Sequence, residues 1–402
     1  MPKALFFNVP GHGHVNPSLP LVAELVRRGD HITYFITSQF RAGVEAAGAE
    51  FRPYSAIHDD FFSGPGLDGT RPFKAANLLI TTAEAVLPEL LETVRAAQPD
   101  YILFDGMCPW GYLVARILRI PAVASLSLMP LGSPRTMMSW PALRVMLPMV
   151  LRNVDEGLAA ARRSRALGKR YNVAPIGLAS ILNTVGDVSL SYTSPYFHPA
   201  PDTVSPTVRF VGWTLRETPA HEPFPFGRTG RRRLIYVSLG TLVNKAPAFF
   251  RACIDAFAGG DDHVVISTGH GVNPDAFGTL PPNITVAAWV PQVDVLKRAA
   301  LFITHGGLGS VHDGLYLGLP LLLVPQQGEQ SMNALRVAEL GAGLMLTQPQ
   351  VNAATLRATA ARLLAEPNFA AAATRIGDSF RAAGGMPRAA DEVEALLRTR
   401  TG

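Results

Sequence analysis

The sequence predicts an α/β protein built from two doubly wound parallel-sheet domains. Short apolar runs, rich in β-branched and aromatic residues, alternate with longer amphipathic stretches in both halves of the chain, a pattern typical of parallel strands joined by helices. The length of 402 residues favours two domains over one. Residues 214–230 are rich in proline, glycine and charge, and they are the best candidate for a linker between the two arrays.

Composition indicates a globular protein that is not a nucleic-acid binder. Hydrophobic residues make up 48% and charged residues 17% of the chain, as in folded domains. The formal net charge of +5 comes with scattered arginines and one basic run, Arg231–Arg233, which favours an anionic small molecule over nucleic acid. Two cysteines, Cys108 and Cys253, cannot form a disulfide framework, so we expect a reducing cytoplasm. We expect no signal peptide and no transmembrane helix, because no apolar run approaches about 18 residues.

The chain opens with a β-α-β pattern. Lys3–Val9 predicts a strand, Ser18–Arg28 an amphipathic helix and Ile32–Ile36 a second strand, with a glycine- and histidine-rich turn at residues 10–17. The turn lacks the third glycine of a dinucleotide-binding fingerprint, and Thr37 stands where an acidic residue would hold an adenosine ribose. The pattern therefore counts against NAD and an oxidoreductase.

Further short apolar runs extend both predicted sheets. In the first half they are Asp100–Asp105, Pro121–Leu128, Asp187–Tyr192 and Val208–Val211, and in the second half Leu234–Leu239, Val264–Ser267, Ile284–Ala287, Ala300–Thr304 and Leu321–Val324. Helical stretches separate these runs, and the tail from Thr355 onward is helical. Ligands of doubly wound sheets bind at the carboxyl ends of the strands, so the residues that follow these strands are candidates for binding.

The most informative stretch is residues 289–333. The strand Ala300–Thr304 runs directly into a glycine-rich turn at residues 305–309, and residues 310–317 predict a helix that Gly318 ends. A strand, a glycine-rich turn and a helix N-terminus together form an anion site, because unpaired N–H groups and the helix dipole point at the ligand.

This stretch resembles the donor-binding signature of the family 1 UDP-dependent glycosyltransferases, which have the GT-B fold. The matching positions are Trp289, Pro291, Gln292, Phe302, His305, Gly307, Ser310, Asp313, Gly318, Pro320, Pro325, Glu329 and Gln330. Within the family, the turn Gly11–Pro17, the stretch Val237–Thr241 and the ending Glu329-Gln330 are most similar to the bacterial macrolide-type enzymes.

The resemblance implies two Rossmann-like domains that face a central cleft. Residues 1–213 would bind the acceptor and carry the catalytic histidine, and residues 214–230 would be the linker. Residues 231–380 would bind the nucleotide-sugar donor, and residues 381–402 would form a helix that packs back on the first domain.

The resemblance also implies how the nucleoside of the donor is held. Trp289 would stack on the base, Gln292 would hydrogen-bond the base or ribose, and Asp313 would accept hydrogen bonds from ribose hydroxyls. Two positions depart from the family pattern. Asp313 stands for the usual glutamate, and Gly309 stands for a common asparagine.

The diphosphate and the sugar have their own implied partners. His305, Ser310 and backbone N–H groups would hold the diphosphate, while Glu329 and Gln330 would bind the sugar hydroxyls. The complete donor set is Ser238, Thr241, Trp289, Val290, Gln292, His305, Gly307, Gly309, Ser310, Asp313, Glu329 and Gln330.

The implied catalytic residues are His14 and Asp105. The turn Gly11–Pro17 resembles a family element whose catalytic histidine lies three residues before a proline, which is His14. His12 is a second candidate for the catalytic histidine that spacing alone does not exclude, and both histidines could instead have only a structural role in the loop. Asp105 ends a predicted strand on the same edge, where its carboxylate would orient the imidazole and support its positive charge. The alternative is a turn aspartate that caps the following helix.

The acceptor side carries weaker signals. Residues 129–152 are rich in Met, Pro, Leu and Trp, which suits an irregular apolar acceptor, although an ordinary core or lid helix or a peripheral membrane contact fits as well. We expect a second acceptor-side loop at residues 61–82. The candidate acceptor-binding residues are Phe61, Met129, Met137 and Trp140.

The function that the resemblance implies is inverting transfer of a hexose, glucose being the first expectation, from a UDP-sugar to a hydroxyl of a macrolide, polyketide or phenolic acceptor. No D-x-D or His/Cys ligand cluster is present, so we expect no metal and no cofactor. Alternatives are a dTDP-deoxysugar antibiotic glycosyltransferase, an epimerase on the same fold, and a nucleotide-sugar-binding protein without turnover. The protein would be a monomer or a homodimer.

Overall fold

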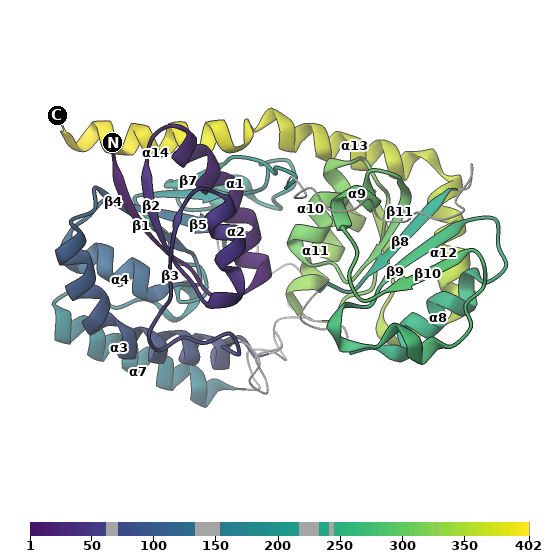
Figure 1. The fold of residues 1–402 in the computed structure, drawn as a ribbon, viewed down its shortest axis with the longest axis horizontal. Helices are drawn as coiled ribbons and strands as arrows, with labels where there is room; N and C mark the ends of the chain where they lie inside the picture. Colours follow the sequence, from purple (N-terminus) through teal and green to yellow (C-terminus); the bar gives the residue numbers. More distant parts are fainter. Residues whose placement is uncertain (62–70, 133–152, 217–232, 241–244, 327, 402) are drawn as a thin grey trace. The chain divides into compact units, whose positions relative to one another are not determined.

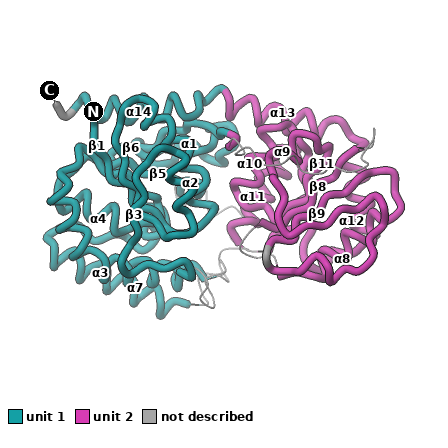
Figure 2. The backbone as a smooth tube through the Cα atoms, in the orientation of Figure 1, with its two compact units in different colours: residues 1–214, 382–402 teal, residues 215–381 magenta. Residues whose placement is uncertain are grey.

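The computed structural model describes residues 1–402 except 62–70, 133–152, 217–232, 241–244, 327 and 402. The chain divides into two compact units (Figure 2). Unit 1 comprises Met1–Thr214 and Ala382–Gly402, and unit 2 comprises Leu215–Arg381. Each unit contains a parallel sheet flanked by helices (Figure 1).

Within its described residues, unit 1 forms a seven-stranded sheet with the order β3-β2-β1-β4-β5-β6-β7. The strands are β1 Lys3–Phe7, β2 His31–Phe35, β3 Glu50–Arg52, β4 Tyr101–Asp105, β5 Ala122–Leu126, β6 Val188–Ser191 and β7 Val208–Phe210. The helices are α1 His12–Arg27, α2 Arg41–Ala46, α3 Pro72–Ala97, α4 Pro109–Leu118, α7 Val154–Tyr171 and α14 Gly385–Thr401, with short turns η1 Ser38–Phe40, η2 Leu178–Ser180 and η3 Pro201–Thr203. All strand pairings are parallel. From β1 the sheet grows on one side through β2 and β3 and on the other side through β4 to β7, so the switch point, where such sheets bind ligands, lies between β1 and β4.

Within its described residues, unit 2 forms a six-stranded parallel sheet with the order β10-β9-β8-β11-β12-β13. The strands are β8 Leu234–Ser238, β9 His263–Ser267, β10 Ile284–Ala287, β11 Ala299–Thr304, β12 Leu321–Leu323 and β13 Gly343–Met345. The helices are α8 Pro247–Phe257, α9 Gln292–Leu296, α10 Leu308–Tyr316, α11 Gly328–Glu339, α12 Ala353–Ala365 and α13 Pro367–Ala382, with η4 Gly269–Gly271, η5 Pro274–Phe277 and η6 Gln348–Gln350. Its switch point lies between β8 and β11, the strands that end at Ser238 and Thr304.

Burial of the central strands explains their sequences. Strands β4, β5 and β8 are buried at every position, because helices cover both faces of the sheets, and they are therefore apolar almost without alternation. In unit 1 the largest buried side chain is Trp110 at the start of α4, whose indole N–H donates to the Tyr54 hydroxyl at 3.1 Å. The residues that follow these strands are thus attached to a buried core.

The C-terminal helix belongs to unit 1. Helix α14 packs against α1 and β6, and the N–H of Gly385 donates to the carbonyl of Val211 at 2.7 Å. The guanidinium of Arg28 donates to Asp391 at 2.7 Å and to Glu394 at 2.8 Å. The chain therefore passes from unit 1 to unit 2 and returns.

Two predictions about elements differ from the structure by more than a few residues, and two strands were not predicted. Helix α1 begins at His12 and includes Pro17 and Pro20, whereas the proline- and glycine-rich turn predicted a start at Ser18. The predicted acceptor-side loop at residues 61–82 is wrong in its second half, because α3 begins at Pro72, and a proline fits the first turn of a helix. The short strands β3 and β13 gave no recognisable period in the sequence.

Neither a membrane span nor a metal cluster is found in the described part of the chain. No described helix has the length and apolar character needed to cross a membrane. No group of three or more His, Cys, Asp or Glu side chains among the described residues is placed to hold a metal ion. Cys108 and Cys253 are both buried free thiols.

Candidate active site

In unit 1, the first turn of α1 places His14 at the carboxyl edge of the sheet. The carbonyl of Gly11, the residue before the helix, accepts hydrogen bonds from the N–H groups of His14 and Val15, both at 2.9 Å. Strand β4 ends at Asp105 on the same edge, next to β1. Residues 91 positions apart in the chain are thereby brought together.

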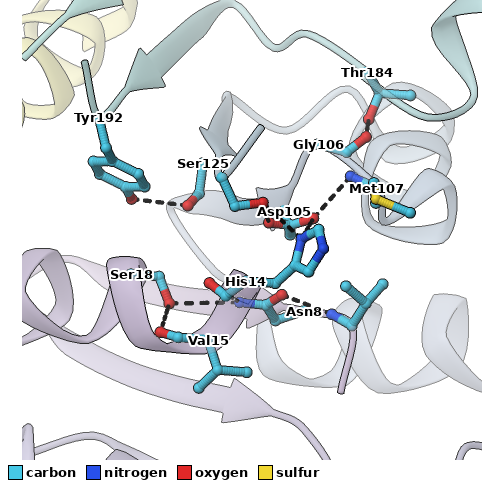
Figure 3. A network of polar contacts seen from close by, with 12 residues as sticks. Asn8, His14, Val15, Ser18, Asp105, Gly106, Met107, Ser125, Thr184 and Tyr192 are labelled. Carbon is cyan, nitrogen blue, oxygen red and sulfur yellow. Dashed lines mark hydrogen bonds and ion pairs between the residues drawn. The ribbon is translucent and has the colours of Figure 1, made fainter. Parts of the chain in front are cut away.

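His14 and Asp105 form a hydrogen-bonded dyad (Figure 3). Nδ1 of His14 lies 3.0 Å from Oδ1 of Asp105, with 14% of the histidine side chain exposed and none of the aspartate side chain. The N–H of Met107 also donates to Oδ1, at 2.8 Å. A carboxylate accepts only, so Nδ1 carries the proton and the lone pair of the neutral ring is on Nε2. This arrangement can take up a proton at Nε2 and stabilise the resulting imidazolium.

The other histidine of the turn has a different setting. His12 is exposed, and its ring contacts Phe40 edge-on at 4.9 Å between centroids. Of the two histidines that sequence spacing left open, His14 is the one bonded to the buried carboxylate.

A buried network of polar side chains contacts the first turns of α1, which carry His14. Nδ2 of Asn8 donates to the hydroxyl of Tyr34 at 2.7 Å, and it lies 3.4 Å from Oγ of Ser18 and 3.5 Å from the carbonyl of His14. Burial raises the pKa of Tyr34 well above its usual value, so the phenol is neutral. Asn8, Tyr34 and Ser18 therefore support the histidine turn, and none of the three was predicted as a site residue.

The predicted acceptor residues are only partly described. Met129 is partly buried, and its carbonyl accepts from Nδ2 of Asn183 at 3.1 Å. Phe61 is partly buried against Trp110, with the ring centroids 6.4 Å apart. Met137 and Trp140 lie outside the described residues.

In unit 2, the turn between β11 and α10 has the geometry of an anion site. Gly306 has a φ of +85°, and Gly307 precedes the helix without a side-chain cap. The N–H groups of Leu308, Gly309 and Ser310 lie in the first helical turn, where backbone donors have no partner within the helix. Negative charge is favoured there by these donors and by the helix dipole.

Two glycines enclose the imidazole of His305. A Cβ on Gly240 would lie 2.6 Å from Cε1 of the ring, and a Cβ on Gly307 would lie 2.4 Å from Nε2. Burial lowers the pKa of His305, opposed by a hydrogen bond to the Ser238 carbonyl, so the ring is neutral near pH 7 although the residue keeps partial exposure. Ser238 is buried at the end of β8, and Thr241 lies outside the described residues.

Helix α11 is fastened to the same turn. Nδ2 of Asn333 donates to the carbonyl of Gly306 at 3.0 Å and to Oε1 of Glu329 at 3.1 Å. Gln330 is buried, and its Oε1 accepts from the N–H of Gln326 at 2.9 Å. Asn333 was not predicted, yet it joins the turn to Glu329, one of the two predicted sugar-binding residues.

The predicted nucleoside-binding residues are also brought together. Nε2 of Gln292 donates to Oδ2 of the buried Asp313 at 2.9 Å, linking α9 to α10. Trp289 is 59% exposed, whereas Val290 beside it is 5% exposed. Trp289 precedes Gln292 by three residues, and an exposed indole together with a bonded amide and carboxylate can offer a stacking face and polar partners to a nucleoside.

Comparison with known proteins agrees with this geometry. Residues 251–396 match the family model described as "Erythromycin biosynthesis protein CIII-like, C-terminal domain". The chain is 33% identical to the NDP-glycosyltransferase YjiC of Bacillus licheniformis, over 97% of this chain and 96% of that protein. It is also 33% identical to the oleandomycin glycosyltransferase of Streptomyces antibioticus, over 98% of this chain and 90% of that protein. The crystal structure of CalG4, the calicheamicin glycosyltransferase, matches with a TM-score of 0.82 and 31% identity, over 99% of this chain and 98% of that chain.

Two parallel-sheet units of this topology, with these relatives, define a glycosyltransferase of the GT-B fold. The chain belongs to the family 1 glycosyltransferases of the bacterial macrolide type.

Proposed function

We propose that this enzyme transfers a hexose, glucose in the first instance, from a UDP-sugar to a hydroxyl of a hydrophobic macrolide, polyketide or phenolic acceptor, with inversion at the anomeric carbon. The contact that carries the proposal is the 3.0 Å hydrogen bond between His14 and the fully buried Asp105. The relatives named for oleandomycin and calicheamicin support a natural-product acceptor.

The reaction is a single displacement at the anomeric carbon. The acceptor oxygen forms a bond to this carbon as the bond to the phosphate oxygen breaks, and the nucleotide diphosphate leaves with the electron pair. Nε2 of His14 takes the proton of the acceptor hydroxyl, and Asp105 stabilises the imidazolium through Nδ1–H. Attack opposite the leaving group converts an α-linked donor into a β-glycoside.

The donor side stabilises the charge that develops on the leaving group. In our proposal the diphosphate is bound by the N-terminal N–H groups of α10, by Ser310 and by the neutral imidazole of His305. Trp289 stacks on the base, Gln292 and Asp313 bind the ribose, and Glu329 and Gln330 bind the sugar. Transfer needs neither a metal nor another cofactor in this scheme, so activity should survive a strong chelator. A cytoplasmic location is part of the same proposal.

Mass spectrometry of the products tests the proposal. Purified protein is incubated with UDP-glucose and, separately, dTDP-glucose, each with a panel of macrolide and phenolic acceptors. We expect a mass gain of one hexose on an acceptor with UDP-glucose, and a β-anomeric coupling in the NMR spectrum of the product. Product with dTDP-glucose alone would overturn the choice of nucleotide, and an α-glycoside would overturn inversion.

A further inference from the structure

A serine contacts both members of the dyad. Ser127 directly follows β5, the strand next to β4, and it is 8% exposed. Its Oγ lies 2.6 Å from Nδ1 of His14 and 2.7 Å from Oδ2 of Asp105. Both distances are shorter than the 3.0 Å between His14 and Asp105 themselves.

The roles of these groups follow from their chemistry. Oδ2 of the carboxylate can only accept, so the Ser127 hydroxyl donates its proton there. The lone pairs of Oγ then face Nδ1 of His14, which donates to Ser127 and to Oδ1 of Asp105 together. Three side chains form a closed ring of hydrogen bonds, and rotation of the imidazole would break two of them.

The backbone that carries Ser127 is held on its far side as well. Asn183 donates to the carbonyl of Met129 at 3.1 Å, and Nε2 of His198 donates to the carbonyl of Pro130 at 2.9 Å. Nδ1 of His198 accepts from the N–H of Ala200 at 3.1 Å, which places the His198 proton on Nε2. The backbone two and three residues after Ser127 is therefore held by side chains of other segments, which limits the freedom of Ser127 to leave the dyad.

We propose that Ser127 is a positioning residue of the catalytic dyad, which holds the proton of His14 on Nδ1 and strengthens Nε2 as the base. The proposal rests on the proposed function of His14 as general base. Ser127 acts through His14 and Asp105 rather than on the acceptor.

Three buried ionisable groups near the dyad are neutral over the useful pH range. Burial raises the pKa values of Tyr34 on β2, Tyr192 after β6 and Cys108 before α4, and each of these groups also senses the charge of Asp105. None of these three groups therefore adds a charge to the dyad, and the Asp105 carboxylate is bonded to His14 directly. Oγ of Ser127 is the dipole closest to Nδ1 among the contacts described, and its negative end favours the imidazolium.

Loss of the hydroxyl should lower the pKa of His14. A hydrogen bond that favours the charged form raises the pKa of a base, and its removal does the opposite. For Ser127→Ala we expect kcat to fall about tenfold, the size of one lost hydrogen bond. The acidic limb of the plot of kcat/KM against pH should move to lower pH, because a His14 with a lower pKa stays deprotonated down to a lower pH.

Two further variants make the test specific. Ser127→Thr keeps the hydroxyl and should recover most of kcat and the original pH profile. Ser125→Ala is the matched control, since Ser125 is a buried serine on β5, the strand that Ser127 follows, and its Oγ bonds the hydroxyl of Tyr192 at 2.8 Å. It should leave the acidic limb in place. UDP binding by calorimetry, together with thermal melts, establishes that every variant is folded.

The outcomes separate the two proposals. An unchanged kcat and pH profile in Ser127→Ala, or equal changes in Ser127→Ala and Ser125→Ala, would overturn the positioning role. His14→Ala is measured in parallel. If His14→Ala keeps full turnover, the proposed function itself fails, whatever Ser127 does.

Discussion

At the scale of single residues, the donor side is best tested at Trp289. Its side chain is 59% exposed, so it adds little to the core, and in our proposal it stacks on the base of the donor. We expect Trp289→Ala to raise the KM for the UDP-sugar about tenfold or more, because stacking of a base on an aromatic ring is worth roughly 1–3 kcal/mol.

Trp289→Phe is the matched control in steady-state kinetics, since it keeps an aromatic face and should recover most of the affinity. The melting temperature should be unchanged in both variants. A donor KM that is the same in Trp289→Ala as in the wild type would contradict the stacking role.

The sequence predicted the residues that bear recognisable chemistry and missed those that support them. His14 lies in the motif after the first predicted strand, and Asp105 ends another predicted strand, so their meeting at one sheet edge could be inferred. In the structure Nδ1 of His14 lies 3.0 Å from Oδ1 of Asp105. Ser127, Asn8 and Asn333 have no motif. Their roles depend on distances between elements far apart in the chain, and periodicity does not provide these. Ser127 lies inside the predicted strand Pro121–Leu128, near its carboxyl end, and only that position could have marked it.

At the scale of elements, helix α14 is tied to α1 by Arg28. The guanidinium is 21% exposed, bonds Asp391 and Glu394, and also donates to the carbonyl of Pro387 at 2.9 Å. We expect Arg28→Ala to destabilise unit 1 by about 1 kcal/mol, near the upper end for a partly exposed ion-pair network, and less at high salt.

The neighbouring Arg27 provides the control in thermal or urea unfolding. Its side chain is 70% exposed and pairs with Glu24 on its own helix, so Arg27→Ala should change the melting temperature much less. Equal effects of the two substitutions would show that the link to α14 contributes nothing beyond an ordinary surface ion pair.

Helix α10 carries a buried histidine that should make unit 2 sensitive to acid. His312 is fully buried, Nδ1 donates to the carbonyl of Leu308 at 2.8 Å, and the ring lies against Phe380. Burial lowers its pKa from 6.5 to about 3. Between these two pH values the unfolded chain binds a proton that the folded chain does not, so stability falls as the pH falls below 6.5.

From pH 6.5 to pH 5 the expected loss from His312 is about 2 kcal/mol. His312→Asn keeps a donor for Leu308 and cannot titrate, so its unfolding free energy in urea should depend less steeply on pH over this window. An identical pH dependence in the variant and the wild type would contradict the assignment of a neutral His312.

Elements were predicted well where burial gives a clear apolar run. Strand β10 has the predicted bounds, Ile284–Ala287, and β4 and β11 differ from the prediction by one residue at their starts. The start of α1 was missed because Pro17 and Pro20 break the usual helix pattern, although tertiary packing keeps the helix intact. The strands β3 and β13 have three residues each, too few for a period.

At the scale of the whole molecule, the fold class followed from alternation of apolar runs with helices, and the two sheets confirm it. The residues of the proposed mechanism are divided between the units, with His14 and Asp105 in unit 1 and His305, Asp313 and Gln330 in unit 2. This division predicts that base catalysis and donor binding can be separated by mutation. The acceptor could not be predicted, because its pocket depends on loops without a motif.

The most direct test of the account is turnover and UDP binding measured on the same samples of wild type, His14→Ala and Asp105→Asn. We predict that each substitution lowers kcat by roughly 10²–10⁴-fold, the usual contribution of a general base. Calorimetry should give a UDP affinity within about twofold of the wild type, because the donor residues are untouched. Full turnover in His14→Ala, or a loss of UDP binding as large as the loss of kcat, would contradict the claim that His14 is the base.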